Sequence, residues 1–153
     1  MREIVRWLSV GAVASLLGTA ALAKEAANLD ANKLGLNGYD PVSYFKPGGP
    51  VLGVEKHRVE ADGAIYQFAT VENLQEFKKD SAKYIPMYGG WCAFAIAKKK
   101  SKVEVDPMSF VIQKGRLFLF YKGFLADTRE KWLKDPNVLQ ERADKFWSEL
   151  NLK

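Results

Sequence analysis

The chain has 153 residues and a formal net charge of +5, and this length allows one hydrophobic core of ordinary domain size but not two comfortable ones. Lysines and carboxylates are mixed along the sequence, so the charge balance mainly concerns solubility and does not indicate a nucleic-acid partner. The basic run at 98–102 contains no aromatic residue, and we expect a solvated turn there.

Residues 1–23 have the layout of a secretory signal. Arg2 and Arg6 precede an uncharged stretch that ends in Ala21-Leu22-Ala23, with small residues at the positions that a signal peptidase reads. We predict cleavage after Ala23. The mature chain is then expected to be soluble, to have no membrane span, and to be periplasmic or secreted. The alternative is an uncleaved anchor, because about 17 uncharged residues reach the lower limit for spanning a bilayer.

The first part of the mature chain predicts a loose arm and then a hairpin. Residues 24–37 show weak periodicity and are expected to form a flexible N-terminal arm, with the folded domain at 38–153. Asp40-Pro41 is a typical start of a short helical turn through 42–45. Asp62-Gly63 tolerates the backbone angles of a tight turn, so we expect the segments 57–60 and 64–68 to pair as an antiparallel hairpin.

Two helices and a second hairpin are expected next. Thr70 can cap a helix through 71–79, and the uncharged, alanine-rich segment 91–97 favours a buried helix over a strand. Lys114-Gly115 separates 109–113 from 116–121, which are rich in aromatic and aliphatic residues. These two strands are expected to form the centre of the sheet.

The C-terminal part predicts helices. Residues 128–134 are expected to be helical around Trp132, and Asp135-Pro136 is again a helix start. An apolar stripe at three- and four-residue spacing follows, made of Leu139, Ala143, Phe146, Trp147 and Leu150. The fold class is therefore α+β, in which two antiparallel hairpins form a small sheet packed with several helices, the last of them amphipathic.

The sequence contains no G-x-S-x-G, phosphate-binding glycine loop, C-x-x-C or H-E-x-x-H motif, which makes a binding protein a better expectation than an enzyme. His57 and Cys92 are the only residues of their types. A lone thiol excludes an internal disulfide. It can be a metal ligand, a reactive group, an intermolecular partner or a buried small hydrophobe.

The segment 84–93 combines aromatic residues, two glycines and this thiol. Gly89 and Gly90 permit left-handed backbone angles and place Cys92 near the start of the expected helix, where the backbone dipole favours a thiolate. Met87 adds a thioether, and soft sulfur ligands suit copper(I). The alternative is that the aromatic residues and the methionine only pack around a tight turn.

The order of motifs along the chain resembles the YHS domain family in its exported, single-domain form. The resemblance covers most of the mature chain and is carried by Gly38-Tyr39-Asp40-Pro41-Val42-Ser43-Tyr44-Phe45, 63–68, 77–80, Lys83-Tyr84-Ile85-Pro86, Tyr88-Gly89-Gly90-Trp91-Cys92-Ala93, Asp106-Pro107 and 114–119.

The resemblance implies a compact α+β module, and it implies heavy-metal binding, often of copper, as in family members that are fused to metal-handling proteins. Those members carry more than one cysteine, whereas only Cys92 matches here. The expected copper(I) ligands are therefore Cys92 with Met87, His57 or Met108, or a site shared by two chains of a homodimer. The expected role is metal trafficking or protection.

Two other functions are open at this point. The first is a module that binds a small ligand or another exported protein in an aromatic-lined pocket. In this case the thiol is only a buried core residue. The expected lining of the pocket is Tyr39, Asp40, Tyr44, Tyr84, Tyr88, Gly89, Gly90 and Trp91. The second is a thiol-dependent redox protein whose cysteine has a lowered pKa and oxidises to a sulfenic acid.

Overall fold

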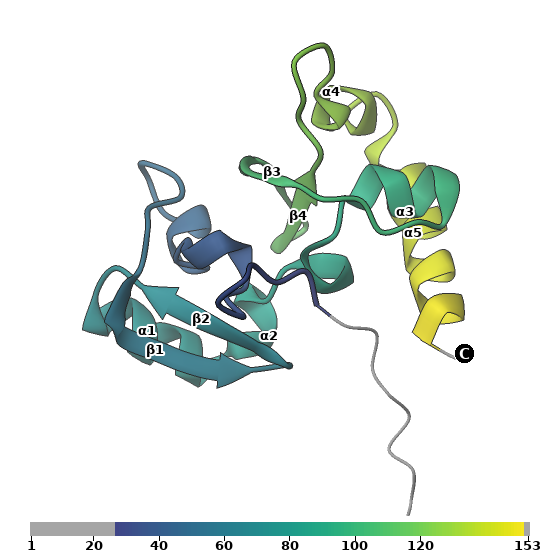
Figure 1. The fold of residues 1–153 in the computed structure, drawn as a ribbon. Coiled ribbons are helices and arrows are strands. Elements are labelled where there is room, and N and C mark those ends of the chain that lie inside the picture. Colours follow the sequence, from purple (N-terminus) through teal and green to yellow (C-terminus); the bar gives the residue numbers. More distant parts are fainter. Residues whose placement is uncertain (1–26, 152–153) are drawn as a thin grey trace, which may run out of the picture.

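The computed structural model describes residues 27–151, and they form an α+β fold in two halves (Figure 1). The predicted signal segment at 1–23 lies outside the described residues. Among those that are described, no helix has both the length and the apolarity needed to cross a bilayer.

The first half is built on the first predicted hairpin. Strands β1 (Val54–Ala61) and β2 (Ala64–Phe68) pair antiparallel. Asp62 and Gly63 join them with φ angles of 54° and 79°, the left-handed values that their types tolerate. Helix α1 (Val71–Lys79) and the single turn α2 (Ser81–Tyr84) follow. The Thr70 hydroxyl accepts from the Asn73 amide at 3.1 Å, which confirms the predicted cap.

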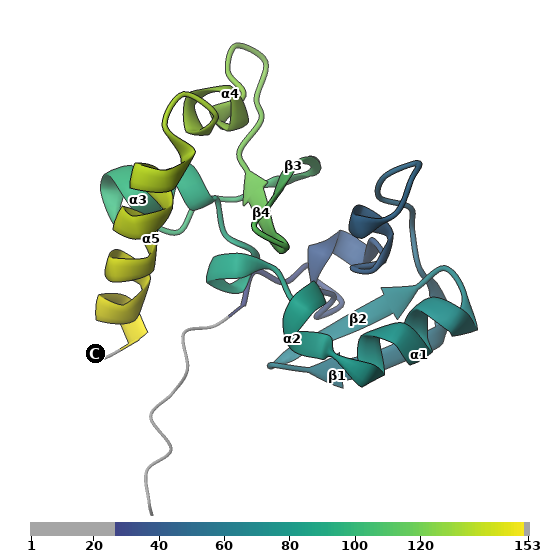
Figure 2. The same ribbon diagram turned by 180° about the vertical axis from the view of Figure 1, so that it is seen from behind.

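The second half contains the other hairpin and the C-terminal helices. Strands β3 (Asp106–Gln113) and β4 (Arg116–Phe120) are antiparallel. Helix α3 (Ala93–Lys99) packs beside the long helix α5 (Pro136–Asn151), as the view from behind also shows (Figure 2). Helix α4 (Thr128–Trp132) ends two residues before the predicted boundary.

The two hairpins do not join into one sheet, which corrects the prediction of a common one. Within residues 27–151 each hairpin forms its own two-stranded sheet. The reason lies in β4, whose two faces enter different cores. Leu117 and Leu119 belong to the apolar cluster of the first half, whereas Phe118 and Phe120 belong to that of the second. Because side chains alternate along a strand, β4 lies between the two cores and contributes one face to each.

The predicted flexible arm is also wrong where the structure describes it. The Asn28 amide donates to the Gly89 carbonyl at 2.8 Å, Leu34 bridges Ile65 of β2, and Leu36 is buried in the first core. The short helices η1 (Leu36–Gly38) and η2 (Ser43–Phe45) continue this packed segment. Three isolated leucines gave too little periodicity to reveal that the segment is held by partners far along the chain.

Candidate functional site

The turn between the halves is formed by η3 (Met87–Gly90), where Tyr88, Gly89 and Gly90 have φ angles of 55°, 62° and 84°. Tyr88 adopts this unusual conformation while its hydroxyl donates to Asp144 of α5 at 2.8 Å. Burial, and then this hydrogen bond, raise the pKa of Tyr88. A Cβ on Gly89 would lie 3.3 Å from the Ala27 Cα, so glycine is needed both for the angle and for the close approach.

A pocket of about 350 Å³ opens beside this turn and is lined by residues of both halves. Tyr88, Gly89 and Met87 line one part of it, and Trp147 of α5 adds a second aromatic wall. The Tyr88 and Trp147 ring centroids are 6.0 Å apart. Asp62 from the first hairpin turn and Arg116 from the start of β4 contribute opposite charges.

This lining suits a small flat molecule with a polar end. Mainly apolar pockets with a few placed polar groups are the usual form of small-ligand sites, and a guanidinium recognises a carboxylate or sulfonate through paired hydrogen bonds. Sequence reasoning missed Arg116, Asp62 and Trp147. Trp147 was interpreted as part of the apolar stripe of α5, and the other two only as residues next to turns.

Most of the other predicted pocket residues lie elsewhere. Tyr44 is buried and donates to the Pro107 carbonyl at 3.0 Å, and burial is the main reason why its pKa is raised. Tyr39 pairs with Leu52 in an isolated bridge, and Trp91 lies beside the Lys102 ammonium. Of the eight predicted residues, Tyr88 and Gly89 line the pocket described above.

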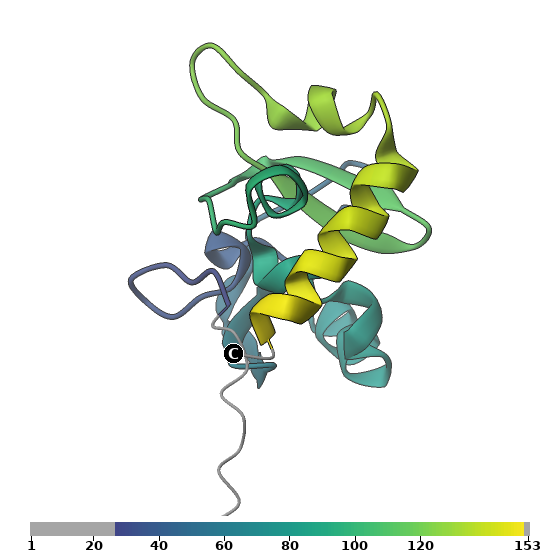
Figure 3. The same ribbon diagram turned by 90° about the vertical axis from the view of Figure 1, so that its right-hand side faces the viewer.

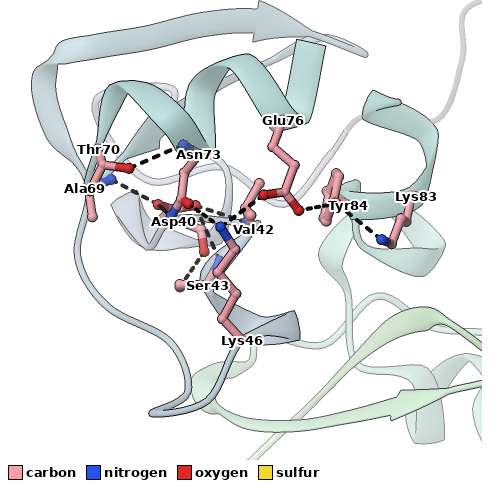
Figure 4. Close-up of polar contacts among 10 residues, drawn as sticks. All are labelled: Asp40, Val42, Ser43, Lys46, Ala69, Thr70, Asn73, Glu76, Lys83 and Tyr84. Atoms are coloured by element: carbon pink, nitrogen blue, oxygen red, sulfur yellow. Dashed lines mark hydrogen bonds and ion pairs between the residues drawn. The ribbon is translucent and has the colours of Figure 1, made fainter. Parts of the chain in front are cut away.

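Asp40 forms a buried polar network in the first half (Figure 4). Its side chain is fully buried. One carboxylate oxygen accepts from the amides of Val42 at 2.8 Å and Ser43 at 3.3 Å, and the other from the Ala69 amide at 2.9 Å and the Asn73 side-chain amide at 2.6 Å. Four donors around one carboxylate fix η2 against the start of α1.

The network continues outward from Asn73 toward the surface, as Figure 4 shows. Lys46 donates to Asn73 at 2.6 Å and pairs with Glu76 at 2.9 Å, and Glu76 accepts from the Tyr84 hydroxyl at 2.6 Å. The Tyr84 hydrogen bond, followed by Lys46, lowers the pKa of Glu76, whereas burial raises that of Tyr84. Because the groups satisfy one another, this network has a structural role.

Cys92 is fully buried at the start of α3. Its sulfur accepts from the Tyr121 amide at 3.3 Å and lies 3.4 Å from the Thr128 hydroxyl oxygen. The Thr128 hydroxyl donates its one proton to the Tyr121 carbonyl at 3.0 Å, so the thiol proton is the one that can bridge sulfur and threonine. The sulfur is thus held by two polar contacts beneath the segment that links β4 and α4.

The other predicted copper ligands have different surroundings. His57 lies on β1 in the first half, Met87 packs on the second core and lines the pocket, and Met108 is half-exposed on β3. Residues 27–151 contain no group of three or more His, Cys, Asp or Glu side chains that could hold a metal ion. Copper(I) binding by these residues stays a prediction that the observed contacts do not support.

We expect Cys92 to be protected from thiol reagents in the native protein. A maleimide should label it at least about 100-fold more slowly than in the urea-unfolded chain, because labelling requires the 121–128 segment to open. Mass spectrometry follows the adduct in the chain that begins at Lys24. The control is Ser148→Cys in a Cys92→Ser background, since position 148 is exposed on α5. Equal rates for Cys92 and the control would contradict the buried thiol.

Comparison with known proteins gives no match to a family model, to a curated protein or to a solved structure. The resemblance to the YHS domain family therefore rests on the sequence motifs alone and stays a prediction.

Proposed function

We propose that this chain is a non-enzymatic binding module that holds a small, flat, apolar ligand carrying an anionic group. The observation that carries the proposal is the pocket beside Tyr88 and Gly89, which Trp147 and Arg116 also line. It is the aromatic-pocket function that the sequence left open, with a lining that the folded chain supplies. With the predicted export signal, we expect such a module to act in the periplasm or outside the cell.

The structure supports a binding role through the way in which the pocket is assembled. Arg116 comes from β4, Trp147 from α5 and Asp62 from the β1–β2 turn, so both halves contribute to one lining. A ligand that touches all three would hold the two halves together and favour the assembled state. Among residues 27–151, no histidine or cysteine lines this pocket, and recognition of such a ligand needs neither.

The first test uses three probes that share an indole ring and differ in charge: indole-3-acetate, indole and tryptamine. We expect affinity to fall in that order, because the Arg116 guanidinium stabilises the carboxylate whereas tryptamine brings a second cation close to it. Titrations monitored by amide chemical shifts should show the largest changes at Ser81, Gly89 and Arg116. Tightest binding by tryptamine would contradict the assignment of an anionic ligand.

We expect Arg116→Gln to weaken indole-3-acetate binding about 10-fold, as loss of one charge-assisted hydrogen bond would, and to leave indole binding unchanged. The matched control is Arg58→Gln, since Arg58 is also an exposed strand arginine but lies away from this pocket. Equal weakening by both substitutions would show that general charge, rather than the pocket, attracts the probe.

A further inference from the structure

The segment that links β4 and α4 carries a projecting apolar tip. Phe124 and Leu125 have 101% and 90% of their surface exposed, although side chains of this size usually contribute to cores or interfaces. The segment extends beyond the rest of the molecule, above β3 and β4 in Figure 1 and at the top of Figure 3. It also lies far from the turn that carries the ligand pocket.

The tip stands on a closed and anchored base. Gly123 donates to the Ala126 carbonyl at 2.8 Å, Lys122 and Asp127 form a bridge, and the Thr128 amide donates to the Tyr121 carbonyl at 3.0 Å. Asp127 accepts from the Ser109 hydroxyl at 2.7 Å and from the Arg129 amide at 2.9 Å. These contacts hold the tip outward.

Gly123 makes room for an aromatic side chain at the base of the tip. A Cβ at this position would come within 2.8 Å of the Tyr121 ring carbon Cζ, a distance that real Cβ atoms do not show. The glycine therefore lets the aromatic ring lie against the backbone of the loop.

Lysines surround the tip. Lys122, Lys131 and Lys134, all exposed, line a hollow of about 450 Å³ between the loop and α4. Two carboxylates share this hollow. Asp127 is paired with Arg129 at 3.4 Å, which leaves Glu130 as the other carboxylate beside three lysine ammonium groups. The apolar tip is therefore bordered by a cationic rim that complements an anionic surface.

We propose that the tip docks on an anionic lipid membrane, with Phe124 and Leu125 inserted among the acyl chains and the three lysines close to the lipid phosphates. Apolar side chains backed by lysines are the pattern of proteins that lie on a membrane surface. A stable protein interface buries at least about 1,200 Å² in total, far more than two side chains supply. Insertion into a bilayer needs no matching pocket.

The test measures partition of the chain that begins at Lys24, which retains every described element, onto vesicles of two compositions. One contains phosphatidylcholine alone, and the other phosphatidylglycerol and phosphatidylcholine at about 3:7. We expect clear binding only to the anionic vesicles. Replacing Phe124 and Leu125 with serine should weaken it about 30-fold or more. The control is a variant in which Val51 and Leu52, which are also exposed, are replaced with serine. It should bind the anionic vesicles as the wild type does.

A second variant tests the cationic rim. Replacing Lys122, Lys131 and Lys134 with glutamine should weaken anionic-vesicle binding about 100-fold, since each lysine near the surface contributes about a factor of five. Arg116→Gln should bind vesicles normally, which separates this proposal from that of the ligand pocket. Circular dichroism verifies that each variant is folded. Unchanged binding by the variant with serine at positions 124 and 125 would overturn the proposal, and so would equal binding of the wild type to both vesicle types.

Discussion

Replacing Asp40 with alanine is expected to lower the free energy of unfolding by about 3–5 kcal/mol, the range seen when one member of a buried charged network is removed. The carboxylate is fully buried and accepts four hydrogen bonds. Its loss leaves the Val42 and Ala69 amides and the Asn73 side-chain amide without this acceptor. The Ser43 amide keeps the Asp40 main-chain carbonyl at 3.1 Å. Buried donors without an acceptor carry the full cost of their desolvation.

Urea unfolding followed by circular dichroism measures this effect, and Asp30→Ala provides the matched control. Asp30 also accepts two backbone amides, those of Asn32 at 2.8 Å and Leu34 at 2.9 Å, but it is only partly buried. Its loss should cost about 1 kcal/mol. If the two substitutions destabilised the protein equally, Asp40 would be an ordinary turn residue and not the centre of a network.

Trp132→Ala is expected to lower the free energy of unfolding by about 3–5 kcal/mol, as large-to-small substitutions of buried aromatic residues do. The indole is fully buried between Phe118 and Phe120, at centroid distances of 5.3 and 5.5 Å. Its Nε1 donates to the Gln113 side chain at 3.0 Å. Removing it opens a cavity in the second core and leaves the Gln113 amide oxygen without this donor.

Two further variants separate packing from hydrogen bonding at this site. Trp132→Phe retains most of the ring and should cost about 1–2 kcal/mol. Leu133→Ala, at the exposed neighbouring position, should change stability by no more than about 0.5 kcal/mol.

Amide hydrogen exchange in β2 and α5 would show whether the halves unfold together, which we expect because β4 borders both cores. Loss of protection in α5 alone after Trp132→Ala would indicate independent halves.

Sequence patterns predicted the elements well where the signals are local. Asp62-Gly63 and Lys114-Gly115 adopt left-handed angles between paired strands, and Thr70 caps α1. The candidate site was only partly predictable. Tyr88 and Gly89 stood out as a motif, but Trp147 is 58 or more positions further along the chain, and nothing in its spacing on α5 indicates which pocket it lines.

The projecting tip had a signal in the sequence that was not used. Phe124 and Leu125 follow a glycine and lie between the second expected hairpin and the helix around Trp132, outside every predicted element. Two large apolar residues in a linking segment indicate either a buried loop or an exposed docking feature. Only the folded chain shows that they point away from both cores.

By itself, the sequence determined the hairpins, the helix starts and the α+β class, because turn residues, caps and apolar periodicity act over a few neighbouring positions. The tertiary structure decided that β4 separates two cores, that Tyr121 and Thr128 contact the Cys92 sulfur, and that Asp62 and Arg116 line one pocket. These outcomes depend on contacts between residues tens of positions apart. Such contacts are selected by how whole surfaces pack and not by local preference.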